Sequence, residues 1–245
     1  MRLLPFLILP LLAATFFAVN QNDSSALPLL QALRTSQAET SPQGSTWWVG
    51  AYSTGSQALP NTGVRGQITV ISYQTPNVLD FWVSDDLSND VWGQVGYYIE
   101  NGATPVAFYQ VWNLSAHKIL DEGVTPVTAG LHLFAMELQS GTTWAFSLDG
   151  RVFGTADMGS SQSSPSYPVY ALSEEHAPRT FSFPTVTFGP ALQVLRSGTW
   201  IDVAMAKSYG TAWGVQGASQ GASMTRGEIE VGTSLSPLSS GTQLW

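Results

Sequence analysis

The stretch Thr143-Trp-Ala-Phe-Ser-Leu-Asp-Gly-Arg-Val152 places the dipeptide Asp149-Gly150 between two runs of residues that favour β-strand. Asp-Gly is a preferred pair for a two-residue hairpin turn, because both turn positions need a positive φ. Residues 100–103, Glu-Asn-Gly-Ala, offer similar turn chemistry earlier in the chain. Both stretches predict antiparallel strand pairs, and therefore an all-β fold.

Short runs rich in β-branched and aromatic residues, separated by turn residues, extend in both directions from this hairpin. The predicted strands cover residues 67–73, 78–83, 91–99, 106–112, 131–138, 143–148, 169–172, 185–188, 192–195, 200–205, 212–216 and 228–231. We find no fixed-period repeat and no long helical pattern beyond the N-terminal region. The sequence therefore predicts one β-sandwich domain over residues 46–233, followed by a loose tail over residues 234–245.

The N-terminus has the layout of a secretion signal. Arg2 precedes an apolar segment over residues 3–19, and a polar run follows it. This order is typical of a signal peptide over residues 1–19. The alternative is an uncleaved membrane anchor, for which the segment is barely long enough. Both alternatives predict export, so we expect the folded part to be secreted or held outside the cytoplasm, and residues 20–45 to form a linker or pro-segment.

The composition excludes several classes of function. Hydrophobic residues make up 44% of the 245 residues and charged residues only 11%, roughly half the usual charged fraction, which argues against a disordered chain. Nine Lys and Arg against seventeen Asp and Glu give a net charge of −8, so the chain is not expected to bind nucleic acid. The chain has no cysteine, which excludes disulfides, thiolate metal sites and a cysteine nucleophile.

Motifs for metal or cofactor chemistry are weak. Residues 217–221 fit the G-x-S-x-G pattern of serine hydrolases, but no histidine follows them in the chain. His117, His132 and His176 lack partners at metal-ligand spacing, so we expect solvated or hydrogen-bonded histidines. No glycine-rich loop opens a helix. We therefore expect no metal and no cofactor, and a monomer.

Amide, acidic and aromatic residues alternate within three of the predicted strands. Because strand side chains alternate between faces, each strand should present three of them on one face. These sets are Trp82, Ser84 and Asp86; Trp92, Gln94 and Gly96; and Phe108, Gln110 and Trp112. Each glutamine alone fits a solvated polar position. Together, the rings, amides and carboxylates suit the binding of an extended peptide or a sugar chain.

In order and spacing, these segments resemble the glutamic peptidases (eqolisins), acid-active endopeptidases of the G1 family. Residues 82–86 resemble a W-V-G-x-D block, residues 94–96 part of an L-Q-x-G block, and residues 108–112 a W-Y-E-W-Y block. Residues 47–50 resemble the early W-x-G segment, and residues 173–175 stand where the family has A-E-W. The resemblance covers about residues 47–190.

The resemblance implies a concanavalin-like (jelly-roll) sandwich of two antiparallel sheets, with an active site on its concave face. It also implies a secreted, acid-active endopeptidase that acts on polypeptides through Gln94 and Glu174. The glutamate would take a proton from the attacking water and the glutamine would stabilise the oxyanion. The substrate-binding or supporting residues implied by the resemblance are Trp48, Trp82, Asp86, Tyr109, Gln110, Trp112 and Glu175.

This sequence departs from the family pattern at three positions. Gln110 replaces a glutamate, Phe108 replaces a tryptophan, and Glu175 replaces the tryptophan after the catalytic acid. The last departure leaves two adjacent candidates for the acid, which point to opposite faces if their strand is continuous. We favour Glu174, because it follows a small residue as the family's acid does.

Two other functions fit the same residues. The first is a sandwich-fold glycoside hydrolase, in which Asp85 or Asp86 and Glu174 or Glu175 form a carboxylate pair. The second is a carbohydrate-binding or surface protein without catalytic activity, in which the same aromatic residues contact the ligand.

Overall fold

The structure is a computed structural model. It describes residues 45–53, 60–87, 90–102, 104–164, 169–177, 183–207, 221–225, 228–232 and 234–235. The predicted signal segment at 1–19, the linker up to residue 44, the strand predicted at 212–216 and the end of the tail lie outside these residues. Within the described part of the chain, no helix is long and apolar enough to span a membrane.

The described residues form strands, in agreement with the prediction of an all-β protein. Their bounds are β1 Ser45–Ser53, β2 Gly63–Val70, β3 Thr75–Asp86, β4 Val91–Gly102, β5 Pro105–Asn113, β6 Lys118–Pro126, β7 Gly130–Ser140, β8 Thr143–Leu148, β9 Arg151–Asp157, β10 Tyr170–Ala177, β11 Val186–Arg196, β12 Thr199–Asp202, β13 Met205–Lys207, β14 Gly221–Thr225 and β15 Glu228–Gly232.

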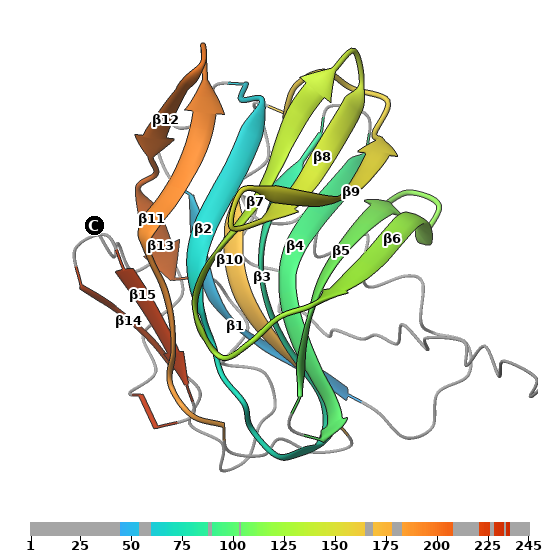
Figure 1. The fold of residues 1–245 in the computed structure, drawn as a ribbon. Helices are drawn as coiled ribbons and strands as arrows, with labels where there is room; N and C mark the ends of the chain where they lie inside the picture. The colour runs from blue at the N-terminus through green and yellow to red at the C-terminus, as the bar shows by residue number, and fades with distance from the viewer. Residues whose placement is uncertain are drawn as a thin grey trace, which may run out of the picture.

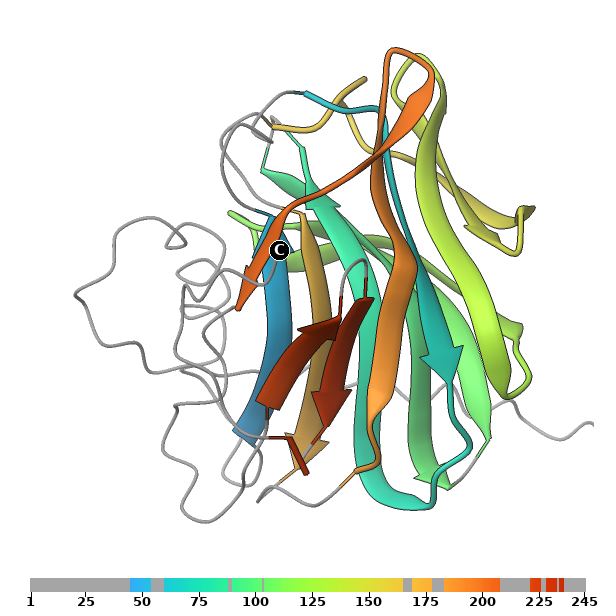
Figure 2. The ribbon, with the colours of Figure 1, turned by 90° about the vertical axis from the view of Figure 1, so that its left-hand side faces the viewer.

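These strands build two antiparallel sheets, which face each other in Figures 1 and 2. One sheet has seven strands in the order β13-β1-β10-β3-β4-β5-β6. The other has eight, with seven in the order β14-β15-β11-β2-β7-β8-β9 and β12 paired to β11. The predicted β-sandwich is confirmed.

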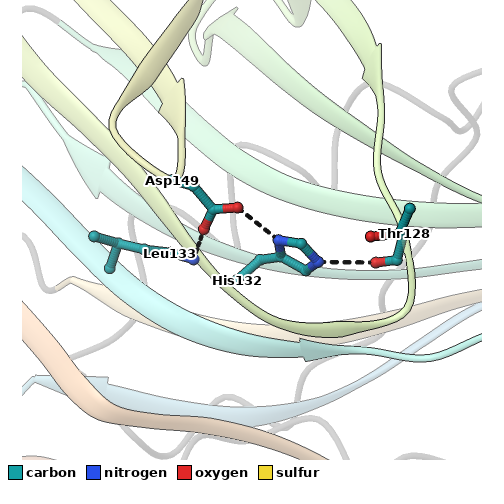
Figure 3. Close-up of polar contacts among 4 residues, drawn as sticks. All are labelled: Thr128, His132, Leu133 and Asp149. Carbon is teal, nitrogen blue, oxygen red and sulfur yellow. Dashed lines mark hydrogen bonds and ion pairs between the residues drawn. The ribbon is translucent and has the colours of Figure 1, made fainter.

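The predicted Asp-Gly hairpin joins β8 to β9. Asp149 and Gly150 have φ values of 52° and 76°, as a two-residue turn of this kind requires. The Asp149 carboxylate accepts a hydrogen bond from the backbone N–H of Leu133 at 2.9 Å (Figure 3). Its other oxygen lies 2.7 Å from Nδ1 of His132, whose Nε2 lies 2.9 Å from the carbonyl oxygen of Thr128. This histidine is therefore hydrogen-bonded, as expected.

The space between the sheets holds the main apolar core, and Tyr109 is part of it. Its ring stacks on Phe146 with centroids 4.3 Å apart, and its hydroxyl donates a hydrogen bond to Asp121 at 3.2 Å. A Cβ at Gly154 would lie only 2.0 Å from the Tyr109 ring, so this glycine provides the space that the ring occupies. Tyr109 thus lies between the sheets, a position that fits the supporting role, one of the two roles considered for it.

A second apolar cluster covers the opposite face of the seven-stranded sheet, which we call the outer face. Its buried members are Trp82, Trp92, Phe108, Leu114, Tyr170 and Leu172, and we call them the outer aromatic cluster. Within it, Trp82 and Trp92 meet edge to face with ring centroids 5.1 Å apart. Since β3 also contributes Phe81 and Val83 to the main core, this central strand is buried on both faces.

Candidate functional site

Strand pairing aligns polar residues from five neighbouring strands in a row across the outer face. The row contains Tyr170 of β10, Ser84 of β3, Gln94 of β4, Gln110 of β5 and Glu122 of β6, each directly opposite the next. We call it the glutamine row. It confirms that the polar residues predicted to share faces of their strands meet on one face of one sheet.

Hydrogen bonds along the glutamine row fix the orientation of Gln94. Its Nε2 donates to Oε1 of Gln110 at 2.7 Å. The same Oε1 accepts a bond from Nε1 of Trp112 at 3.3 Å, and Nε2 of Gln110 donates to Glu122 at 3.2 Å. Because a primary amide has two N–H groups, this network leaves one N–H of Gln94 for a further acceptor. Gln110, which replaces a family glutamate, positions this amide.

Asp86 lies in the next row, directly opposite Trp92 of β4. Its side chain is 1% exposed, and neither carboxyl oxygen has a hydrogen-bond partner among the described residues. Burial raises the pKa of Asp86 well above its ordinary value, and the nearby Asp85 and Asp90 carboxylates raise it further. An ionisable group that is buried and unpaired in this way is a candidate for function.

Several other buried polar atoms on the same face as Asp86 also lack partners among the described residues. They are Nε1 of Trp82, Oγ of Ser84, Nε1 of Trp92 and Oε1 of Gln94. An unsatisfied buried polar group costs roughly 1–3 kcal/mol, so such a concentration is unusual in a region that only supports the fold. The indole N–H groups are donors and the carboxyl and amide oxygens are acceptors, so the set offers both kinds of hydrogen-bonding group.

Asp85 points the other way, into the interior, and is completely buried. Burial raises its pKa to about 8, while bonds from the side chain of Asn61 and the backbone N–H of Asp86 oppose this rise. The N–H of Asp86 lies 2.9 Å from Oδ1 of Asp85. Asp85 therefore lies inside the sandwich, away from the outer face, and of the two adjacent aspartates only Asp86 lies on that face.

Glu174 lies on the outer face but in a different row from Gln94. Glu174 of β10 is opposite Asp80 of β3, and Gln94 of β4 is opposite Ser84 of β3. Asp80 and Ser84 are four residues apart along β3. With strands ~4.8 Å apart and a rise of ~3.3 Å per residue, two strands and four residues separate the Cα atoms of Gln94 and Glu174 by ~16 Å. The register thus brings the two residues onto one face without placing them side by side.

The remaining candidates lie near Glu174. Trp48 is its partner on β1 and Glu175 pairs with Leu79 of β3. The side chains of Trp48 and Glu175 are outside the described residues. β10 runs without interruption through both glutamates, as the sequence argument about opposite faces assumed. Sequence reasoning missed Asp80, although its spacing of two from Trp82 was enough to place it on the outer face.

The outer face becomes exposed toward β6, at the edge of the sheet. Val124, opposite Phe108, is 63% exposed, and Leu120 is 46% exposed on the other side of Glu122. The face thus changes from buried rings at its centre to exposed apolar side chains at its edge. Among the described residues, no three His, Asp or Glu side chains are grouped so that they could hold a metal ion.

No protein-family model matches the sequence, and no curated protein matches it significantly. Solved structures do match the fold. The structure is similar to Scytalido-glutamic peptidase bound to a peptide-based transition state analog, with a TM-score of 0.53 and 14% identity. A second structure of that peptidase, with a transition state analog inhibitor, gives 0.54 and 15%. SCP-B, an eqolisin in complex with the tripeptide Ala-Ile-His, gives 0.50 and 15%.

Each of these matches covers 80% of this chain and 100% of the other chain. At such low identities, the likeness establishes the fold and leaves the chemistry to be argued from the residues. The resemblance inferred from the sequence is confirmed at that level: the chain has the sandwich fold of the eqolisin glutamic peptidases.

Proposed function

We propose that this chain is a secreted endopeptidase that hydrolyses peptide bonds in acid, with Gln94 at its reactive centre. The observation that carries the proposal is the buried Gln94 amide, which Gln110 holds in place on the outer face of an eqolisin-type sandwich. A fixed amide in a site with little water is suited to bind a developing oxyanion. The solved neighbours were crystallised with peptide-like ligands, which supports a polypeptide substrate.

The chemistry needs one amide and one carboxyl group. The carboxylate removes a proton from water, the water oxygen attacks the peptide carbonyl carbon, and the free N–H of Gln94 stabilises the negative oxygen that forms. The carboxyl group then gives the proton to the leaving amine. The resemblance implies Glu174 as this carboxyl group.

The electrostatics of the site support operation at low pH. Asp85 is completely buried and its pKa is raised, so low pH keeps it neutral with little disturbance to the fold. Since few charged residues are present, few ion pairs would be lost when carboxylates become protonated.

The edge of the outer face supports an extended substrate with apolar side chains. Leu120 and Val124 are exposed on either side of Glu122, next to the glutamine row. A chain lying across the strands from Gln94 toward β6 would meet these side chains. We expect cleavage to be favoured by apolar residues near the scissile bond.

A specific observation also supports the glycosidase alternative. Asp80 and Glu174 are directly opposite each other on the outer face. The Cβ atoms of opposed residues are ~4.5–5.5 Å apart, a spacing that allows two carboxyl groups to approach the ~5–5.5 Å found in retaining glycosidases. The variant Asp80→Asn should abolish hydrolysis of polysaccharides if this pair is catalytic.

A substrate panel separates these functions. Full-length protein, purified from the medium of an expressing host, is incubated between pH 2 and 7 with a denatured protein and, in parallel, with a set of β-glucans. Our proposal predicts new peptide termini and no reducing sugars. It also predicts activity that survives thiol reagents, chelators and serine-directed phosphonates. Cleavage of glucans alone would establish the alternative, and turnover of neither substrate would indicate a binding protein.

A further inference from the structure

We infer that Asp86 is the carboxyl group that acts with Gln94 in this chain. The inference rests on the proposed peptidase function and identifies the general base of that reaction. It assigns to Asp86 a role that the sequence resemblance gives to Glu174.

The first argument is distance along the sheet. Asp86 is opposite Trp92, and Gln94 is two residues further along β4, so Asp86 and Gln94 are diagonal neighbours on adjacent strands. The Cα atoms of diagonal neighbours are ~7–8 Å apart, within the reach of two side chains and one water molecule. By contrast, strand spacing and rise per residue place the Cα atoms of Glu174 and Gln94 ~16 Å apart.

The position of β10 that does lie in the glutamine row is occupied by Tyr170. Its ring belongs to the outer aromatic cluster and is buried. A phenol is a poor general base at acid pH, because its ordinary pKa is ~10. The strand that carries Glu174 thus offers no carboxyl group at the level of Gln94.

The second argument is the state of the Asp86 carboxyl group. A carboxyl that served only the fold would normally be paired with a cation or bonded to several N–H groups. Among the described residues Asp86 has neither, and the nearby ionisable groups that act on it, Asp85 and Asp90, are both acidic. On the outer face, Oγ of Ser84, Nε1 of Trp92 and Oε1 of Gln94 also lack hydrogen-bond partners among the described residues. This arrangement disfavours the folded state electrostatically and is suited to holding a reactant.

The reaction can be written with every proton accounted for. Asp86, as carboxylate, takes one proton from water while the water oxygen forms a bond to the peptide carbonyl carbon. The N–H of Gln94 stabilises the oxyanion. The C–N bond then breaks as the protonated Asp86 returns the proton to the amine nitrogen, which releases a carboxylic acid and an amine. Because Asp86 must be ionised for the first step, the rate should rise with pH through its raised pKa.

The test compares Asp86→Asn with Glu174→Gln in full-length protein, and adds Asp90→Asn, which removes a nearby exposed carboxylate that acts on the pKa of Asp86. We expect Asp86→Asn to lower kcat by ~10²–10⁴-fold, at least tenfold more than Glu174→Gln. Its melting temperature at neutral pH should equal or exceed that of the wild type, because a buried group prone to ionisation has been removed. Asp90→Asn should shift the acid limb of the pH profile of kcat/KM to lower pH, because it removes a charge that raises the pKa of Asp86.

The outcomes separate this inference from the proposed function. A wild-type protein that cleaves no polypeptide would contradict the proposed function itself. Full activity in Asp86→Asn, with loss in Glu174→Gln, would overturn the inference and leave the peptidase proposal intact. If Asp86→Asn does not fold, the Asp90→Asn profile decides: a shift of the acid limb supports the assignment, and an unchanged limb overturns it.

Discussion

The completely buried Asp85 makes the stability of this protein depend on pH in a direction opposite to that of most proteins. In the folded state its pKa is raised to about 8, against 3.8 for an ordinary aspartate, mainly by burial. Between these two values the unfolded chain is ionised at this position and the folded chain is not. Because the folded state then binds more protons than the unfolded state, the free energy of unfolding decreases as pH rises.

The magnitude follows from the two pKa values. A shift of one unit corresponds to ~1.4 kcal/mol, so a rise from 3.8 to about 8 corresponds to stabilisation at low pH on the order of 6 kcal/mol. This stability is fully present below pH ~4 and is lost as pH rises toward the folded-state pKa. Asp86, with its pKa raised by burial, acts in the same direction.

The variant Asp85→Asn isolates this contribution. In the wild type, Oδ1 of Asp85 accepts a hydrogen bond from the backbone N–H of Asp86 at 2.9 Å. Asparagine keeps an oxygen that can accept this bond, and it cannot ionise. We expect the wild type and Asp85→Asn to be about equally stable at pH 4 and the variant to be more stable at pH 8. Urea denaturation at unit intervals between pH 4 and 8, followed by tryptophan fluorescence, measures both curves. Parallel curves, with no gain for Asp85→Asn at pH 8, would refute the argument.

Two further substitutions test the packing and the surface electrostatics. Gly96→Ala should destabilise the protein by about 1–3 kcal/mol or prevent folding, because the added Cβ would lie 2.0 Å from the carbonyl oxygen of Phe81. Gly102→Ala on the same strand is the control. Its added Cβ would lie 3.5 Å from the nearest atom, so this variant should be as stable as the wild type in the same urea titration. At Asp149, burial raises the pKa of the carboxyl group, but the hydrogen bonds from His132 and from the backbone N–H of Leu133 lower it more, so the pKa lies below its ordinary value. Asp149→Asn should therefore reduce stability at pH 7. The difference in stability should vanish as pH falls below the ordinary carboxyl range. Equal melting temperatures for both Asp149 forms at pH 7 would contradict this.

The fold could be predicted because its signals are local. The positive φ values at Asp149 and Gly150 follow from the residues themselves, and the alternation along β3 and β4 identifies which side chains share a face. The same alternation places Asp85 with Phe81 and Val83, inside the sandwich. On β5 the same alternation places Tyr109 with Ala107 and Val111 in the main core.

The candidate site could be predicted only in part, because the offset between distant strands is not visible in one sequence. Ser173 to Glu175 resemble a family block in composition, and that resemblance identifies the strand without fixing its register against β3. The register places Glu174 opposite Asp80 and leaves Tyr170 opposite Ser84. The burial of Asp86 depends on the outer aromatic cluster, whose residues come from several strands.

The most direct test of the central claim is the rate at which Gln94→Ala cleaves a denatured protein in acid, compared with wild type. Gln139→Ala, at an exposed position of β7 in the other sheet, is the matched control. If Gln94 stabilises the oxyanion, its loss should lower kcat by ~10²–10³-fold, with a circular dichroism spectrum like that of the wild type. Gln139→Ala should cleave at the wild-type rate. A folded Gln94→Ala protein that retains the wild-type kcat would contradict the assignment of the reactive centre to the outer face of the seven-stranded sheet.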